Sequence, residues 1–194
     1  MNYTRVGVRR PRSRLLTAMI AGFLLTTGAT GQEMSALVAM QWAVLSKVLT
    51  FDRNLARMGK EVAVGVLYQP QVRRSTVVKD ELLAAIDLGQ SSDLRFTGTA
   101  ISFTSKTDLV AILGDVDVLY KSPLRSVDLS MILAQSRRLR IATLTGVPEY
   151  VQSGVAVGID LQGGKPRILI NLNSAMAEGV DFGSGLLKLA KIVQ

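Results

Sequence analysis

The stretch that decides the fold is the C-terminal one, residues 165–194, which reads KPRILINLNSAMAEGVDFGSGLLKLAKIVQ. Its apolar run at residues 168–172 has the length and the β-branched content of a strand. Asn173 or Ser174 can then cap a short helical turn, which Gly179 ends in the left-handed conformation. The pattern predicts a strand that leads through a tight corner.

A second helix is expected after this corner, capped by Asp181 or Ser184. Its apolar residues recur at helical spacing and predict one buried face, formed by Leu186, Leu187, Ala190 and Val193. We expect the strand, the corner and this closing helix to complete a hydrophobic core rather than to carry chemistry.

Upstream, segments with strand and helix patterns alternate. Strands are expected at residues 61–68, 95–103, 116–120, 140–145, 155–161 and 167–172, and helices at residues 34–49, 75–88, 106–113 and 123–138. This alternation predicts an α/β fold with a mostly parallel central sheet and helices on both faces. The Gly163-Gly164 turn predicts a C-terminal antiparallel hairpin at one edge.

The first 31 residues have the three parts of a secretory signal peptide. Five arginines and no acidic residue form the basic start, residues 15–27 are apolar, and Ala29-Thr30-Gly31 supplies small residues before Gln32. An uncleaved anchor is the alternative. We therefore expect residues 1–31 to be a signal peptide, residues 32–194 to be a single domain, and the mature protein to be periplasmic.

Composition excludes several classes of function. The chain has 23 basic and 15 acidic residues, but removing the expected leader leaves 18 and 15, a net charge of +3. The high pI is then mostly a property of the leader, and no nucleic-acid partner is expected. The 194 residues include no cysteine and no histidine, so thiol chemistry and the commonest general base and zinc ligand are excluded.

Two motifs that suggest chemistry have simpler explanations. Residues 158–165, GIDLQGGK, are similar to a phosphate-binding loop, but the lysine comes one residue late and Pro166 replaces the required Ser or Thr. Asp115, Asp117 and Asp128 do not have the spacing of a calcium loop. We expect no cofactor and no metal, and no motif supports an enzyme, although Ser-Lys catalysis stays open.

Candidate contact residues come from two places. Small ligands of open α/β sheets bind beyond the carboxyl ends of the parallel strands, which here predicts contacts from Tyr68, Lys121, Ser122, Arg125 and Tyr150. The basic pair Arg137 and Arg138 suits either a solvated helix end or contact with an acidic partner surface.

The C-terminal stretch resembles the signature of the YfiR/HmsC family. Residues 170–193 contain its strand ending in I-N-L, its alanine-rich turn and glycine, and its S-x-L-L-x-L-A-x-I/V motif, and residues 143–160 match more loosely. The chain is similar to a divergent member, because residues 47–51 read KVLTF where the family has an aromatic residue and a Trp-Pro pair.

The resemblance implies a periplasmic regulatory protein that restrains a membrane-bound diguanylate cyclase by binding its periplasmic sensor region. It leaves open a homodimer and a small-molecule effector. The alternative function is a periplasmic small-molecule-binding domain with its pocket at the strand carboxyl ends. A hydrolase that works without histidine or cysteine is a third, weaker alternative.

Overall fold

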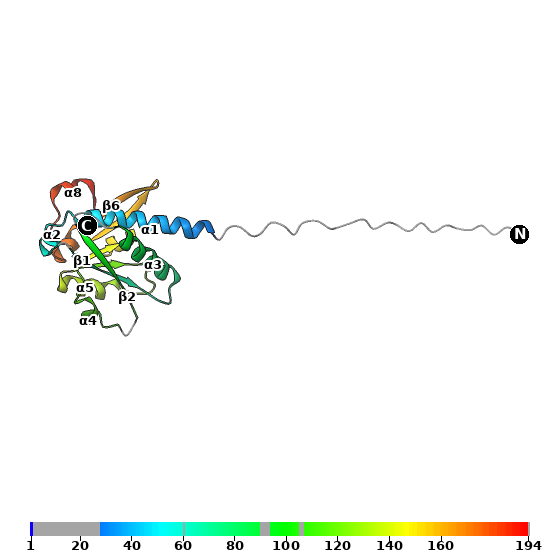
Figure 1. The fold of residues 1–194 in the computed structure, drawn as a ribbon, viewed down its shortest axis with the longest axis horizontal. Helices are drawn as coiled ribbons and strands as arrows, with labels where there is room; N and C mark the ends of the chain where they lie inside the picture. Colours follow the sequence, from blue (N-terminus) through cyan, green and yellow to red (C-terminus); the bar gives the residue numbers. More distant parts are fainter. Residues whose placement is uncertain (2–27, 60, 90–93, 105–106, 194) are drawn as a thin grey trace.

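The chain forms an α/β domain around a seven-stranded sheet (Figure 1). The structure is a computed structural model that describes Met1 and residues 28–59, 61–89, 94–104 and 107–193, with side chains of the first helix from residue 37 onward. The expected leader lies outside the described residues apart from Met1 and the helical backbone at residues 28–31.

The sheet has the strand order β2-β1-β3-β4-β5-β6-β7. Its strands are β1 (Glu61–Tyr68), β2 (Arg95–Ser102), β3 (Val118–Lys121), β4 (Ala142–Thr145), β5 (Val157–Gln162), β6 (Lys165–Asn171) and β7 (Lys191–Val193). The first five strands pair in parallel, β6 is antiparallel to β5, and β7 is parallel to β6. The predicted fold class and the hairpin are therefore confirmed.

Helices cover both faces of the sheet. They are α1 (Gly28–Leu49), α2 (Arg53–Met58), α3 (Arg73–Leu88), α4 (Leu109–Leu113), α5 (Leu129–Leu139), α6 (Pro148–Gln152), α7 (Leu172–Ala177) and α8 (Ser184–Leu189). The larger hydrophobic cluster joins α1 and α3 to one face, and the smaller joins α4 and α5 to the other. Among the described helices, none is both long enough and apolar enough to cross a bilayer.

Alternation within the strands explains the two clusters. In β1, Val62, Val64 and Val66 belong to the larger cluster, whereas Leu67 belongs to the smaller. Successive side chains of a strand point to opposite faces, so a strand covered on both sides needs apolar residues in both registers. The nearly continuous apolar sequence of β1 therefore places it inside the sheet, between β2 and β3.

The prediction of a closing helix is wrong for the second half of that segment. Helix α8 ends at Leu189, and Lys191–Val193 form β7 beside β6. Leu186 is buried, whereas Leu187 is only half-buried and Val193 belongs to the strand. The free edge of β6 offers backbone hydrogen bonds, and β-branched Ile192 and Val193 suit them better than a further helical turn.

Most helices also begin at other residues than expected: α1 at Gly28, α3 at Arg73 and α4 at Leu109, instead of residues 34, 75 and 106. Helix α5 begins at Leu129 instead of residue 123, because the Asp128 side chain accepts a hydrogen bond from Ser130 N. The N-cap residue of α7 is Asn171 instead of Asn173 or Ser174, and that of α8 is Gly183 instead of Asp181 or Ser184. The short helices α2 and α6 have too few residues to show a periodic pattern.

Candidate functional site

The strand order places a topological switch point between β1 and β3. From β1 the chain continues to β2 on one side, and β3 lies on the other. Ligands of open α/β sheets bind outside the carboxyl ends of the strands at this point. Four polar residues lie here: Tyr68 and Lys121 are the last residues of β1 and β3, and Gln69 and Ser122 directly follow them.

The loop after β3 is held at this edge by two side chains. The Gln69 amide accepts a hydrogen bond from Arg125 N at 2.6 Å and donates one to Arg125 O at 3.1 Å. The Tyr150 hydroxyl accepts from Leu124 N at 2.8 Å and donates to Leu124 O at 3.1 Å. The predicted residues Arg125 and Tyr150 are thus brought together with the end of β1, and the Arg125 side chain is exposed.

A small hollow of about 50 Å³ lies on the α1 side of these strand ends. Its lining includes Val38 and Gln41 from α1, Arg74 from α3, and Tyr120, Pro123 and Gly146 from the strand ends. A Cβ atom on Gly146 would lie 2.3 Å from Gln41 Oε1 and 2.8 Å from the Tyr120 hydroxyl, so only glycine permits this approach. Burial raises the pKa of Tyr120 above its ordinary value, and the phenol stays neutral.

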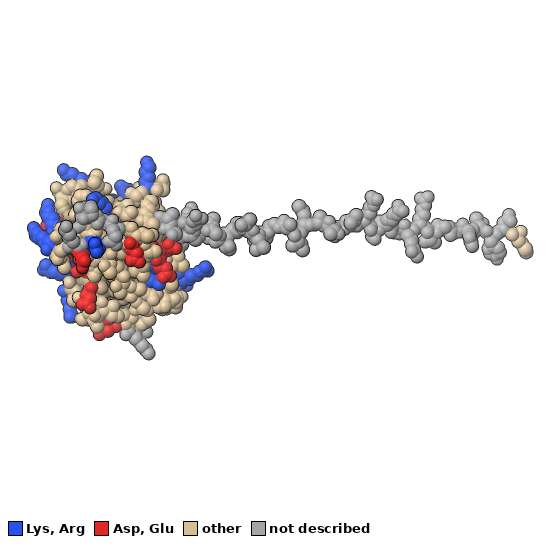
Figure 2. Space-filling view, viewed as in Figure 1, with Lys and Arg blue, Asp and Glu red and all other residues tan. Residues whose placement is uncertain are grey.

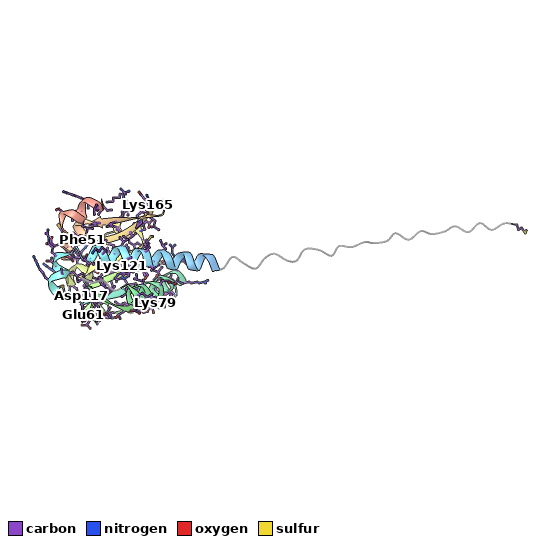
Figure 3. The ribbon with its side chains drawn as sticks, turned by 45° about the horizontal axis from the view of Figure 1, so that its top comes forward. Phe51, Glu61, Lys79, Asp117, Lys121 and Lys165 are labelled. Carbon is purple, nitrogen blue, oxygen red and sulfur yellow. The ribbon has the colours of Figure 1, made fainter. Side chains whose placement is uncertain are left out.

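The opposite side of the same strand ends holds a buried polar cluster. Lys121 is fully buried and its ammonium group has no hydrogen-bond partner. Glu178, which is 1% exposed, accepts hydrogen bonds from Thr143 N and from the Thr143 hydroxyl, both at 2.8 Å. Arg137 donates to Ser174 Oγ at 3.3 Å at the border of the cluster. Figure 3 shows Lys121 inside the body of the protein.

Burial dominates the electrostatics of this cluster. It lowers the pKa of Lys121 from its ordinary value to about 7, an effect that the carboxylate of Glu178 opposes and Arg137 reinforces. Burial also raises the pKa of Glu178 to about 7, against the effects of Lys121, the Thr143 hydrogen bonds and Arg137. The cluster can therefore take up and release protons near neutral pH.

The predicted contact residues fall into three groups. Tyr68, Arg125 and Tyr150 lie at the carboxyl ends of the strands, and the Tyr68 ring lies under the Lys79 ammonium group, 4.9 Å from its centroid. Lys121 and Ser122 lie at the same edge but are fully buried, so a ligand reaches them only if the strand end opens. For all five of these residues, the role as a ligand or partner contact stays a prediction.

Arg137 and Arg138 lie elsewhere, in the last turn of α5. Both are exposed, but Arg137 reaches the buried cluster through Ser174. Within the described residues no group of three or more acidic side chains could hold a metal ion. Two of the three aspartates considered for a calcium site have structural roles. Asp117 accepts a hydrogen bond from Ala63 N at 2.8 Å, and Asp128 caps α5.

Sequence reasoning missed Gln41, Gln69, Thr143 and Glu178. Glu178 gave one local signal, a carboxylate directly before the left-handed Gly179 at the corner that follows a strand. Its partner Thr143 lies 35 residues earlier, so the pairing required the fold.

The strand order defines a doubly wound α/β fold whose polar strand-end residues lie at its switch point. A family model described as YfiR/HmsC-like matches residues 73–191, and the chain belongs to this family. Membership supports a periplasmic regulator and fits a protein that is not an enzyme. A comparison with curated proteins finds no match.

Solved structures with the same fold include a Streptococcus pneumonia ABC domain in complex with L-Trp (13% identity, TM-score 0.59) and a conserved domain protein from Vibrio cholerae (11%, 0.53). A third is a substrate binding protein with adhesive properties from Clostridium difficile in a ligand-free, open structure (16%, 0.52). They match 81%, 81% and 69% of this chain but only 62%, 60% and 54% of their own lengths. At such low sequence identity, the structural similarity shows a common fold and nothing about function.

Proposed function

We propose that this protein is exported to the periplasm and restrains a membrane-bound diguanylate cyclase by binding the periplasmic sensor region of that enzyme. The observation that carries the proposal is the YfiR/HmsC-like match, which extends over residues 73–191 and includes the whole buried cluster, together with Lys121, Ser122, Arg125 and Tyr150 of the strand-end site. The signal peptide at residues 1–31 and the single domain at residues 32–194 are parts of the same proposal.

A periplasmic protein acts on a cytoplasmic active site only through the conformation of the membrane enzyme. It must bind the inactive conformation of the outer region more tightly than the active one. A tenfold preference corresponds to about 1.4 kcal/mol, which a modest protein interface supplies. No catalytic group is needed for this mechanism.

Gene deletion tests the proposal. We expect deletion to raise cellular cyclic di-GMP and to strengthen surface attachment, and the full chain to reverse both effects. A chain without Met1–Gly31 should fail to reverse them, because it stays in the cytoplasm. A second deletion, of one membrane diguanylate cyclase, should cancel the effect and identify the partner. Unchanged cyclic di-GMP, or full rescue by the leaderless chain, would contradict the proposal.

The second candidate function is small-molecule binding at the strand carboxyl ends, either alone or as the effector site of the regulator. The hollow beside the carboxyl ends of β3 and β4 favours it, and one structural neighbour is described in complex with L-Trp and another as a substrate binding protein. Small-molecule sites usually have volumes of about 300–1,000 Å³, so α1 would have to move away from Gly146 to admit a ligand.

A thermal-shift screen with amino acids and other small metabolites tests this candidate. A true ligand raises the melting temperature in proportion to the logarithm of its concentration above its Kd. Opening of α1 predicts that the ligand also increases hydrogen exchange around Gln41. A screen without any concentration-dependent shift argues against an effector site.

A further inference from the structure

Four exposed arginines lie on α2 and at the end of α5, two segments at the amino ends of the strands, on the opposite edge of the sheet from the hollow. Arg53 and Arg57 belong to α2, and Arg138 and Arg140 belong to the end of α5; all four are exposed. We call this surface the arginine face. In Figure 2 blue side chains line the left edge of the molecule, where Figure 1 places α2 and α5.

Short contacts hold these segments together around Gly179. Asn54 Nδ2 donates to Gly179 O at 2.8 Å, and Arg57 donates to Asn54 Oδ1 at 3.4 Å. On the other side of Gly179, a Cβ atom added to this glycine would lie 3.3 Å from Cβ of Arg140, so the Arg140 stem packs against it. Arg57 and Arg140 therefore flank the same turn, although the two residues are 83 positions apart in the sequence.

Few acidic residues lie on the segments that carry these arginines; the other carboxylates of this edge are Glu61 at the start of β1 and Asp115 and Asp117 before β3. In the segments that form the face, residues 51–58, 137–140 and 176–184, the acidic residues are Asp52, Glu178 and Asp181. Asp52 and Glu178 are buried, and the partly exposed Asp181 pairs with Arg53 at 3.3 Å. The guanidinium groups of Arg57, Arg138 and Arg140 are thus left to face solvent without an acidic neighbour on these segments.

Exposed apolar side chains lie on the same segments. Met58 and Met176 are 71% and 60% exposed, and Phe51, just before α2, is 44% exposed. Arginine, methionine and aromatic residues are enriched in protein–protein interfaces, whereas lysine and acidic residues are depleted. Membrane-binding surfaces instead favour tryptophan and tyrosine anchors with many lysines. The composition of the arginine face therefore fits a protein partner better than a lipid surface.

Arg140 also has an unusual backbone conformation. It ends α5 in the left-handed region with φ of 56°, a conformation that glycine or asparagine adopts at lower cost. Strained positions are often retained where they orient a functional side chain. Here the strain directs an arginine stem across Gly179.

We propose that the arginine face is the docking surface for an acidic, apolar-centred patch on the periplasmic region of the restrained cyclase. Planar guanidinium groups would pair with carboxylates of the partner while Met58 and Met176 contact its apolar centre. This inference rests on the proposed function. It places partner binding at the amino edge of the sheet, and any small-molecule effector at the carboxyl edge.

The test uses protein exported to the periplasm and the purified periplasmic region of the cyclase that the double-deletion experiment identifies. Arg57→Glu with Arg140→Glu should weaken binding at least about tenfold, with much of the loss in the association rate constant. Arg57→Glu with Arg138→Glu repeats the test without altering the strained position. The matched control is Arg73→Glu with Lys165→Glu, which makes the same charge change at the start of α3 and at the tip of the hairpin.

Each outcome separates the two proposals. If wild-type protein binds and both face variants bind equally well at unchanged melting temperature, the arginine face is not the interface and the proposed function stands. If wild-type protein does not bind the cyclase region, the proposed function fails and this partner assignment fails with it. If the face variants keep cyclase binding but lose adsorption to phosphatidylglycerol vesicles, the face is a membrane-binding surface and the docking proposal is overturned.

Discussion

Glu178 holds Thr143 by two hydrogen bonds, one from the backbone N–H and one from the hydroxyl, each 2.8 Å long. The Thr143 hydroxyl in turn accepts a hydrogen bond from Ala156 N at 2.9 Å. The carboxylate thereby connects the end of α7 to β4 and to the residue before β5. Lys121 lies near this carboxylate without a hydrogen-bond partner, so the structure buries two ionisable groups of opposite sign together.

We expect this cluster to give the free energy of unfolding a minimum near pH 7. The folded-state pKa of Glu178 is raised from 4.5 to about 7, so its contribution is present below pH 4.5 and is lost as the pH rises to 7. The pKa of Lys121 is lowered from 10.5 to about 7, so its contribution is present above pH 10.5 and is lost as the pH falls to 7.

Urea unfolding between pH 5 and 9 measures this profile. Glu178→Gln should flatten the acidic arm and Lys121→Met the alkaline arm. Lys121→Met should also raise the pKa of Glu178 further, because the lysine charge lowers it, and carboxyl-carbon NMR reports that pKa. A wild-type profile without a minimum would show that the two groups titrate at ordinary values.

The second prediction concerns the contact between α1 and the strand ends. Gly146→Ala would place a Cβ atom 2.3 Å from Gln41 Oε1 and 2.8 Å from the Tyr120 hydroxyl, so the buried Gln41 side chain or α1 itself must move. We expect a loss of about 1–3 kcal/mol in the free energy of unfolding. Gly185→Ala is the matched control, because nothing lies within 4 Å of its Cβ position in α8 and alanine favours a helix. Equal stability of the two variants would mean that α1 does not pack tightly on Gly146.

The third prediction tests the orientation of α8. Leu186 is 2% exposed and belongs to the larger hydrophobic cluster, whereas Leu189 is 76% exposed. Leu186→Ala should cost about 2–4 kcal/mol, and Leu189→Ala should change stability by less than about 0.5 kcal/mol. Thermal and urea unfolding measure both. Similar losses in the two variants would be incompatible with the position of this helix.

How far the sequence predicts this structure depends on how local each signal is. The almost continuous apolar sequence of β1 and the Gly163-Gly164 turn identify a buried strand and a hairpin, and the structure contains both. Strand β7 is not predictable in this way, because Lys191–Val193 continue a helical pattern and only pairing with β6 makes them a strand. Tertiary hydrogen bonding there outweighs local periodicity.

The candidate site shows the same limit. The rule about strand carboxyl ends leads to Tyr68, Lys121, Ser122, Arg125 and Tyr150, but it does not tell a surface residue from a buried one. Lys121 ends a strand that has helices on both sides, and its side chain is buried in the interior, where the charges of Glu178 and Arg137 affect its pKa. The identity of those neighbours depends on contacts between distant segments, which composition and spacing do not contain.

The last prediction concerns Tyr150 and the loop after β3. Its hydroxyl satisfies both backbone groups of Leu124, one as acceptor at 2.8 Å and the other as donor at 3.1 Å. Tyr150→Phe leaves these partly buried groups without that partner and should cost about 1–2 kcal/mol, with faster hydrogen exchange at Leu124 and Arg125. Tyr68→Phe is the matched control, since phenylalanine keeps the ring under the Lys79 ammonium group. If the loop is as well protected in Tyr150→Phe as in the control, Gln69 alone holds it, and Tyr150 is then free to contact a ligand at the strand ends.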